Sequence, residues 1–373
     1  MSRLTRPATR LSKPPKSANL IVEIAMIQPM LNKGIEMLIG RRALVASLLV
    51  SLASAGVAQA ADFYAGKQIT LIVGAPAGGG YDMLGRLVSR HMGKHIPGNP
   101  TFIVQNMPAA NSVVATNFLA NAAPRDGTTI ALVQRGMLLA KLINPNGVQF
   151  DIAKLNWIGN LNSETGVTLA LAHAPVTDAK QLFEKELIVG GQTGVDPEMT
   201  PRLYNALLGT KFKIISGYEG TTAIGLAMER GEVEGIGDWS WSSLKVQRPE
   251  WIRDKKVLVL IQGALEKDPE LPDVPSALDL VRDDLSRKAL ELYFTQKTVA
   301  RPMVAPPGVP AERMAVLLSA LVELGQDKDF LEDAKRSKLE IGILPGEAVQ
   351  KVIAMIAAAP PEAVDKLIKG MTQ

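Results

Sequence analysis

The chain has 373 residues, of which 47% are hydrophobic and 21% are charged, and it contains no cysteine. This length is enough for about two ordinary domains, and the composition excludes a largely disordered chain. Without cysteine, disulfides, iron–sulfur clusters and thiolate zinc sites are excluded, and three histidines argue against a multi-histidine metal centre. We therefore expect neither a metal nor a cofactor.

The net charge of +4 comes from the N-terminal part of the chain. Residues 1–60 hold eight of the 41 basic residues but only two of the 37 acidic ones, so residues 61–373 are slightly acidic. Proteins that bind nucleic acid carry a basic patch or stripe that contacts the phosphates. We therefore expect no nucleic-acid partner for the folded part of the chain.

Residues 37–60 have the three parts of a secretory signal peptide. Two arginines form its positive region, residues 43–56 form its apolar region, and residues 58–60 (Ala-Gln-Ala) form an A-x-A cleavage site. A membrane anchor is the alternative, but the apolar run is shorter than the roughly 20 residues that a bilayer requires. We predict export to the periplasm after cleavage between Ala60 and Ala61.

Residues 1–36 do not fit this signal. They are polar and contain Pro14-Pro15, and they place the apolar region unusually far from the N-terminus. We interpret them as a non-native upstream extension, with Met37 as the natural start. A long extension of the positive region is the alternative.

Strands and helices alternate along the first part of the exported chain. Apolar runs predict buried strands at residues 69–74, 101–105 and 128–133, and apolar residues at helical spacing predict helices at 81–95 and 113–123. Such alternation is typical of a parallel sheet with helices on both faces.

The same rhythm returns after residue 163. Strands are predicted at residues 167–172, 187–190, 212–216, 233–237 and 257–261, and helices at 197–208, 221–230 and 285–296. Residues 298–305 lead back towards the first unit, and the remainder is predicted to be helical. The sequence thus predicts two α/β units of similar plan.

Four glycine-containing loops follow predicted strands, at residues 75–80, 106–112, 191–196 and 217–220. Ligands of open parallel sheets bind at the carboxyl ends of the strands. Two such sheet edges that face each other would form a binding cleft, and we expect one here.

The first of these loops contains Gly78, Gly79 and Gly80 at the start of a predicted helix, where free N–H groups favour an anion. It is not a P-loop, because Gly80 stands where that motif needs lysine, and it is not a dinucleotide fingerprint, because Met83 replaces the third glycine. Asp82 either orders the loop through N–H groups, accepts from a ligand hydroxyl or water, or opposes the helix dipole.

The order of these motifs resembles that of a known family. The glycine loop with Asp82 is followed by residues 105–108 (Gln-Asn-Met-Pro), residues 124–128 (Pro-Arg-Asp-Gly-Thr), residues 217–220 (Gly-Tyr-Glu-Gly) and residues 305–310 (Ala-Pro-Pro-Gly-Val-Pro). The chain is similar to the extracytoplasmic solute-binding proteins of tripartite tricarboxylate transporters, the Bug or TctC-like family.

The resemblance implies an α/β fold of the two-lobed periplasmic binding protein type (Venus flytrap, type II-like), in which each lobe is a parallel-rich sheet flanked by helices. Residues 61–162 together with 299–373 would form domain 1, and residues 163–298 would form domain 2. The family members close on a carboxylate-bearing solute and deliver it to separate membrane permease subunits. We expect a monomer whose ligand is a small carboxylate.

The resemblance also implies the ligand-binding residues, carried over motif by motif. The first loop supplies Ala77, Gly78, Gly79, Gly80 and Asp82; the second supplies Ala109, Ala110, Asn111 and Ser112; domain 2 supplies Thr193, Gly194, Tyr218, Gly220 and Thr221. Asp238 begins a segment that follows a short predicted strand, so we expect it to face the cleft as well. The second loop departs from the family, which usually has a proline and then a glycine-rich run. Arg135, directly after the third strand, either reaches the cleft or caps the sheet edge.

Other functions were weighed against this interpretation. His91 and His95 share one helix face, but the H-E-x-x-H acid of zinc enzymes is absent, so a surface pair is expected. A secreted α/β hydrolase needs a nucleophile with a base in reach, and no G-x-S-x-G elbow occurs. A binding protein that feeds a membrane sensor kinase remains open as an alternative to transport.

Overall fold

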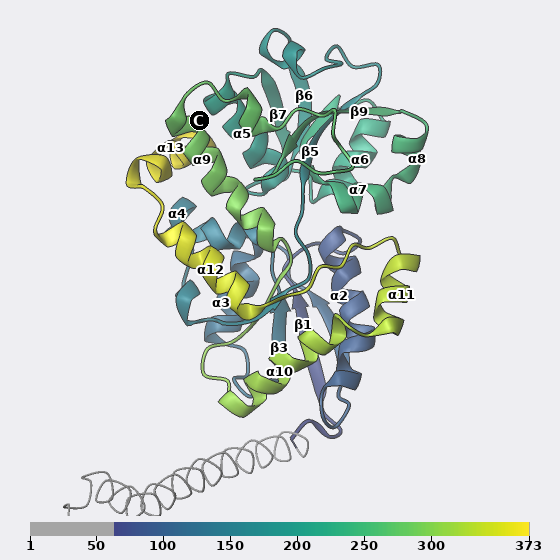
Figure 1. The fold of residues 1–373 in the computed structure, drawn as a ribbon, viewed down its shortest axis with the longest axis vertical. Coiled ribbons are helices and arrows are strands. Elements are labelled where there is room, and N and C mark those ends of the chain that lie inside the picture. The colour runs from purple at the N-terminus through teal and green to yellow at the C-terminus, as the bar shows by residue number, and fades with distance from the viewer. Residues whose placement is uncertain (1–62, 373) are drawn as a thin grey trace, which may run out of the picture. The chain divides into compact units, whose positions relative to one another are not determined.

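The computed structural model describes residues 63–372 (Figure 1). The predicted upstream extension, the signal peptide and its cleavage site lie outside the described residues. The described part is organised by a six-stranded and a five-stranded sheet. We call each sheet, with the helices that cover it, the first and the second lobe.

The first lobe contains the six-stranded sheet in the order β11-β4-β10-β3-β1-β2. Its strands are β1 (Gln68–Val73), β2 (Thr101–Asn106), β3 (Thr129–Leu132), β4 (Asn156–Asn160), β10 (Pro302–Ala305) and β11 (Leu344–Pro345). Strand β1 pairs in parallel with β2 and β3, whereas β10 is antiparallel to both β3 and β4, and β11 is antiparallel to β4.

Helices cover both faces of this sheet: α2 (Gly80–His91), α3 (Val113–Asn121), α4 (Ala140–Ile143), α10 (Ala311–Leu324), α11 (Lys328–Arg336) and α12 (Gly346–Ala357). The alternation along β1 separates the two cores, because successive side chains point to opposite faces. Leu71 packs in the cluster that contains Leu87 of α2 and Leu317 of α10, while Ile72 packs in the one that contains Leu119 of α3 and Val349 of α12.

The second lobe contains the five-stranded sheet in the order β7-β6-β8-β5-β9. Its strands are β5 (Gly166–Leu171), β6 (Leu187–Gly191), β7 (Phe212–Ser216), β8 (Gly235–Ser240) and β9 (Val257–Gly263). Its helices are α5 (Asp196–Leu208), α6 (Thr221–Glu229), α7 (Trp241–Gln247), α8 (Pro249–Arg253), α9 (Asp284–Thr295) and α13 (Pro361–Thr372). Strand β6 is parallel to β7 and β8, and β5 is antiparallel to β8 and β9.

The parallel-rich α/β fold expected from the sequence is confirmed, with one refinement. Each lobe has a parallel core of three strands that is extended by antiparallel strands, so both sheets are mixed. Strand β8 begins two residues later than the predicted strand and continues to Ser240, which places Asp238 inside the strand rather than after it.

Within the described residues the chain passes between the lobes at three places. These lie between β4 and β5, between α9 and β10, and between α12 and α13. Helix α12 packs on β4, whereas α13 packs on α5 and α9 and lies beside α9 in Figure 1. The last helix therefore contacts the second lobe. The predicted domain boundaries at 162/163 and 298/299 stay predictions.

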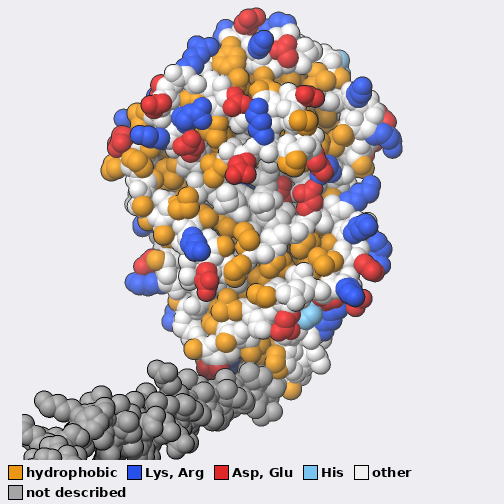
Figure 2. Space-filling model, in the orientation of Figure 1, with side chains coloured by type: hydrophobic (Ala, Val, Ile, Leu, Met, Phe, Trp, Pro, Cys, Tyr) orange, Lys and Arg blue, Asp and Glu red, His pale blue; other side chains and the backbone are white. Residues whose placement is uncertain are grey.

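Among residues 63–372, no helix combines the length and apolarity that crossing a membrane requires. Acidic and basic side chains are interspersed over the face shown in Figure 2. The predicted surface pair of histidines, His91 and His95, lies in the first lobe, and both side chains are half-buried. His91 contacts Asp333 within α11, and His95 contacts Asp327 at the start of α11.

Candidate functional site

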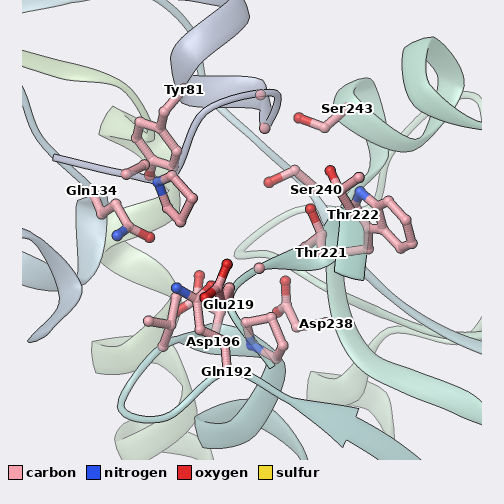
Figure 3. Close-up of a pocket in the computed structure, with 18 of the residues that line it drawn as sticks. Tyr81, Gln134, Gln192, Asp196, Glu219, Thr221, Thr222, Asp238, Ser240 and Ser243 are labelled. Atoms are coloured by element: carbon pink, nitrogen blue, oxygen red, sulfur yellow. The ribbon is translucent and has the colours of Figure 1, made fainter. Parts of the chain in front are cut away.

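A cavity of about 310 Å³ lies where the carboxyl ends of the parallel strands of both lobes meet. Its walls come from the segments that follow β1, β2 and β3 in the first lobe and β6 and β7 in the second, and from β8 and the start of α7. This is the place that the topology of open α/β sheets favours for a ligand. Figure 3 shows polar side chains from both lobes around it.

Half of the predicted ligand-binding residues line this cavity. They are Ala77, Gly79, Gly80, Asn111, Arg135, Gly220, Thr221 and Asp238. The others, which lie in the same loops without lining it, are Gly78, Asp82, Ala109, Ala110, Ser112, Thr193, Gly194 and Tyr218. All four predicted loops therefore reach the cavity, although the second does so only through Asn111.

Two helix N-termini open on the cavity from opposite lobes. In α2 the first helical bond runs from the Met83 N–H to the Gly79 carbonyl at 3.0 Å, and in α6 it runs from the Ile224 N–H to the Gly220 carbonyl at 3.1 Å. The N–H groups of the preceding residues have no helical acceptor, because the first turn of a helix always lacks one. Gly80 and Thr221, the first residues of the two helices, both line the cavity. Such N–H groups and the helix dipole favour an anion.

Asp82 orders the first loop. Its carboxylate accepts from the Gly78 N–H at 2.9 Å, from Arg86 Nε at 3.0 Å and from Asn106 Nδ2 at 3.0 Å. Burial raises the pKa of Asp82, but these hydrogen bonds outweigh burial and hold its pKa below the usual value. Of the roles left open by the sequence, the structure thus assigns Asp82 the positioning of the glycine loop.

The second lobe repeats this arrangement. The Glu198 carboxylate accepts from the Gly194 N–H at 2.7 Å and from Arg202 Nη2 at 2.8 Å. In both loops a glycine with positive φ (Gly78, φ 80°; Gly194, φ 72°) is followed four residues later by an acid and eight residues later by an arginine. Two separate loops at the cavity are therefore fixed by the same local contacts.

The second loop holds an unusual backbone without glycine. Ala109, Ala110, Asn111 and Ser112 have φ values of 137°, 46°, 52° and 67°. Side chains with a Cβ rarely adopt this region, and asparagine tolerates it best. The buried Ser112 hydroxyl secures the loop by donating to the Gly74 carbonyl at 2.7 Å and accepting from the Gln134 N–H at 2.8 Å. The loop thus joins the ends of β1 and β3.

Arg135 reaches across the cavity instead of capping the sheet edge. Its guanidinium comes from the first lobe and forms an ion pair with Asp196 at the start of α5, and its Nη1 donates to Ser240 Oγ at 3.2 Å. Burial alone lowers the pKa of Arg135, but the carboxylates of Asp196 and Asp238 more than offset it and raise the pKa. The guanidinium therefore stays charged and links the lobes.

A buried polar network continues behind this pair. Asp238 accepts from Lys297 Nζ at 2.5 Å and from the Thr200 hydroxyl at 2.9 Å, and the Tyr293 hydroxyl donates to Asp196 at 2.9 Å. Burial raises the pKa of Asp196, but the charges of Arg135 and Lys297 lower the pKa by more than burial raises it. The pKa of Asp196 therefore lies below the usual value. Asp196 is thus held ionised, and Asp238 is held by Lys297 and Thr200 in the cavity wall.

A second arginine, Arg301, lines the cavity directly before β10. It is 1% exposed, its Nη2 donates to Glu164 Oε1 at 3.0 Å, and its guanidinium lies 4.2 Å from the centre of the Tyr81 ring. The Tyr81 hydroxyl donates to the Ala300 carbonyl at 2.8 Å and accepts from the Arg135 N–H at 3.0 Å. Tyr81 therefore ties the start of α2 to the segment between the lobes.

Sequence reasoning missed several residues of the wall: Tyr81, Gln134, Gln192, Asp196, Glu219, Thr222, Ser240, Ser243 and Arg301. Some of them had a signal, because Asp196 and Glu219 stand in or beside the predicted loops, and the repeated glycine–acid–arginine spacing marks the second-lobe loop. Arg301 and Ser243 had none, because each reaches the cavity through contacts between segments far apart in the chain.

The cavity offers binding groups but no imidazole base. His91 and His95 lie at the contact of α2 with α11, and His173 is exposed, so none of the three histidines of the chain lines the cavity. Among residues 63–372 there is also no group of three or more His, Asp or Glu placed to hold a metal ion.

Comparisons with known proteins agree with this architecture. No family model matches the chain. Among curated proteins it is 23% identical over 342 residues to the "UPF0065 protein in tcbD-tcbE intergenic region" of Pseudomonas sp. strain P51, across 88% of this chain and 94% of that protein. It is 28% identical over 267 residues to a UPF0065 protein of Agrobacterium vitis, across 69% of this chain and 74% of that protein.

Three solved structures share the fold. They are the periplasmic binding protein BugD (TM-score 0.65, 20% identity, 82% of this chain and 97% of that chain), MatC from Rhodopseudomonas palustris with bound malate (0.60, 20%, 82% and 99%) and a TctC solute binding protein from Polaromonas (0.57, 19%, 81% and 98%).

The fold is therefore that of the two-lobed periplasmic binding proteins. Within that class, the predicted resemblance to the Bug and TctC-like family is confirmed at the level of the fold, which the chain shares with BugD and with a TctC solute binding protein.

Proposed function

We propose that this chain is a periplasmic solute-binding protein that captures a small organic carboxylate between its lobes and delivers it to the membrane permease subunits of a tripartite tricarboxylate-type transporter. The observation that carries the proposal is the cavity at the carboxyl ends of the parallel strands, with the free N-termini of α2 and α6 on its walls. The malate bound by the similar MatC is itself a small carboxylate.

The solute carboxylate binds to backbone N–H groups at the start of α2, those of Gly79, Gly80 and Tyr81. Asp82 and Ser112 act as positioning residues, since each fixes a loop by hydrogen bonds to backbone groups. Arg135 does not serve as a free carboxylate clamp, because its guanidinium is already paired with Asp196. A site built from backbone donors accepts dicarboxylates, tricarboxylates or aromatic acids.

The protein releases its solute unchanged. General-base and nucleophilic mechanisms at neutral pH most often use histidine, and the cavity wall contains none. This supports binding without turnover rather than hydrolysis. In the same proposal the chain works as a monomer in the periplasm. Residues 61–162 and 299–373 form domain 1 and residues 163–298 form domain 2, except that the last helix, α13 (Pro361–Thr372), packs on domain 2.

A ligand panel tests this function. The purified chain is unfolded and refolded to remove carried-over solute, and its melting temperature is recorded with di- and tricarboxylates, aromatic acids, the matching amides and neutral sugars. A ligand at a hundred times its Kd stabilises the folded state by about 2.7 kcal/mol, which raises Tm by several degrees. We expect a rise with at least one carboxylate and none with its amide.

A pair of proline variants locates the binding. Gly79→Pro removes an N–H at the cavity in an extended conformation (φ −85°) that proline can adopt, and Ala311→Pro places proline at the first residue of α10, away from the cavity. Only Gly79→Pro should abolish the rise in Tm. Sugars that stabilise the chain while no carboxylate does so would contradict the proposal.

A further inference from the structure

Two of the segments that connect the lobes are hydrogen-bonded to each other. We call residues 161–164 and 297–301 the hinge ribbon. Three backbone bonds of 3.0–3.1 Å join its two sides: the Leu161 N–H to the Arg301 carbonyl, the Ala300 N–H to the Asn162 carbonyl, and the Glu164 N–H to the Lys297 carbonyl. Because both sides of the ribbon run from one lobe to the other, a movement between the lobes bends it.

The side chain of Arg301 lies at the junction of this ribbon with both lobes and is 1% exposed. Its Nη2 donates to Glu164 Oε1 across the ribbon at 3.0 Å and to Ser243 Oγ of α7 at 3.3 Å. Its guanidinium lies 4.2 Å from the centre of the Tyr81 ring of α2, within the range of a cation–π contact. A Cβ added at Gly80 would lie 3.4 Å from the same Nη2. One guanidinium therefore contacts the ribbon, the second lobe and the start of α2.

The carboxylate that pairs with Arg301 is also held by the second lobe. Glu164 Oε1 accepts from Asn162 Nδ2 at 3.0 Å and from the hydroxyl of Ser242, the neighbour of Ser243 in α7. If α7 moved away, this buried ion pair would lose both serine hydroxyls, and buried charges that lose hydrogen-bond partners cost free energy. The pair thus favours the closed arrangement, in which α7 contacts the ribbon and α2.

Tyr81 connects the same junction to the proposed carboxylate site. It is the second residue of α2, and its own N–H is one of the donors assigned to the solute. Its hydroxyl donates to the Ala300 carbonyl of the ribbon at 2.8 Å and accepts from the Arg135 N–H at 3.0 Å. Figure 3 shows Tyr81 and Ser243 on opposite sides of the cavity. A carboxylate bound to the first turn of α2 therefore also fixes the ring on which Arg301 packs.

We propose that Tyr81 and Arg301 are positioning residues that couple capture of the solute to closure of the lobes. This inference rests on the proposed function and concerns the regulation of its site. The Arg301 guanidinium reaches Tyr81 of the first lobe and Ser243 of the second only where the lobes meet. A solute that orders Tyr81 favours closure, and closure in turn strengthens solute binding, because such coupling is reciprocal.

A pair of spin labels measures closure directly. Because the chain has no cysteine, Glu332→Cys on α11 and Asp254→Cys directly after α8 introduce the only labelling sites. Both positions are exposed, and they belong to different lobes. Double electron–electron resonance records the distance between the labels with and without malate, succinate, citrate or benzoate, and calorimetry records each Kd. We expect an acid that binds to narrow the distances to one population.

Two variants test the coupling in this labelled chain. Tyr81→Phe keeps the ring and removes both hydroxyl bonds. Arg301→Lys keeps a positive charge beside Glu164 but loses the planar group that packs on the ring. Both variants should bind the acid about tenfold less tightly, the effect of one or two hydrogen bonds, and should keep a broad distribution of distances when saturated. Their melting temperatures without solute establish that they fold.

Tyr64→Phe is the matched control. It removes another buried tyrosine hydroxyl, which donates to the Gly127 carbonyl at 3.3 Å and does not line the cavity, so Kd and distances should stay unchanged. The coupling is wrong if the parent chain binds an acid without narrowing, or if Tyr81→Phe and Arg301→Lys still narrow as the parent does, whatever their Kd. In both cases the proposed function stands. If none of the four acids binds the parent chain, the proposed function is wrong and this inference falls with it.

Discussion

The second loop at the cavity has a backbone conformation that is unfavourable for the residues that occupy it. Four consecutive residues, Ala109 to Ser112, occupy positive φ without a glycine among them. Asn111 fits this region, and Ser112 is compensated by two buried hydrogen bonds. Ala109 and Ala110 have no polar side chain with which to compensate, so the loop holds backbone strain beside the cavity.

Ala110→Gly is therefore expected to stabilise the protein by about 1 kcal/mol, because glycine adopts φ 46° without the clash of a Cβ. Urea denaturation measures the change in the free energy of unfolding. The matched control is Ala354→Gly in the exposed middle of α12, which should destabilise by about 1 kcal/mol. Equal losses in the two variants would show that the loop is unstrained.

Single residues also mark the limit of the sequence. The glycine loop and its Asp82 could be predicted from the spacing of residues in the sequence. Their position beside the cavity could be predicted because the loop follows a parallel strand, at the edge of the sheet where ligands bind. The role of Arg135 could not be decided, because its partner Asp196 comes from the other lobe and no local pattern connects them. From the sequence, Arg135 could either reach the cleft or cap the sheet edge, and only the three-dimensional contact with Asp196 distinguishes these two roles.

At the level of elements, the contact of α2 with α11 gathers charged side chains. Asp333 of α11 contacts Arg90 Nη2 and His91 Nε2, both at 2.9 Å. Asp327, which caps α11, contacts Lys94 Nζ at 2.6 Å and His95 Nε2 at 2.9 Å. Two aspartates thus hold the end of α2 and the turn of 3₁₀ helix that follows it (Met92–His95) against α11.

This contact should make stability depend on acid pH. Hydrogen bonds from His91 and then Arg90 lower the pKa of Asp333 to about 2. Because the folded-state pKa is depressed, its stabilisation is complete above the unfolded pKa of about 3.9 and is lost as the pH falls towards 2. We expect the free energy of unfolding to drop over this interval.

Asp333→Asn should flatten this acid limb and lower stability at neutral pH. Asp365→Asn, an exposed acid on α13 without an ion pair in the described residues, is the control. Unfolding curves in urea between pH 2 and pH 7 provide the measurement. Parallel pH profiles for the parent chain and Asp333→Asn would show that the contact contributes nothing.

Helices and strands could be predicted from the sequence where their buried residues form an unbroken apolar pattern. The strand at residues 69–74 and the helix after it were visible because apolar residues repeat at the period of each element. Strand β4 was missed because polar residues occupy both of its ends. Its Asn156 donates to the distant Pro306 carbonyl, and its Asn160 accepts from the distant Arg301 N–H as well as donating to the nearby Asn162 carbonyl. No window of sequence contains both sides of such a contact.

At the level of the whole molecule, the lobes meet closely beside the cavity. A Cβ added at Gly80 in α2 would collide with the Ser243 side chain of α7. The absence of a side chain at Gly80 therefore permits the approach of the second lobe. Neighbouring Gly79 differs, because a Cβ there would meet only the Pro76 carbonyl at 3.7 Å, an ordinary contact.

Gly80→Ala should hold the lobes apart and weaken solute binding by about 1–3 kcal/mol, the usual effect of overpacking. Ser243→Gly should restore binding in the double variant, since it removes the colliding atoms. Gly79→Ala in the same loop should bind as the parent chain does. Calorimetry with the solute found by the panel measures all four proteins, and a loss that Ser243→Gly does not restore would contradict this role of Gly80.

The passage of the chain between the lobes has a mechanical consequence. Three separate connections join the two lobes: the segment between β4 and β5, the segment before β10, and the turn from α12 to α13. A single linker leaves free torsion, whereas three attachments spread over an area resist torsion and sliding and leave bending as the soft direction. Any opening of the cavity is thereby confined to one hinge-like path, along which α2 and α6 keep the same register across the cavity.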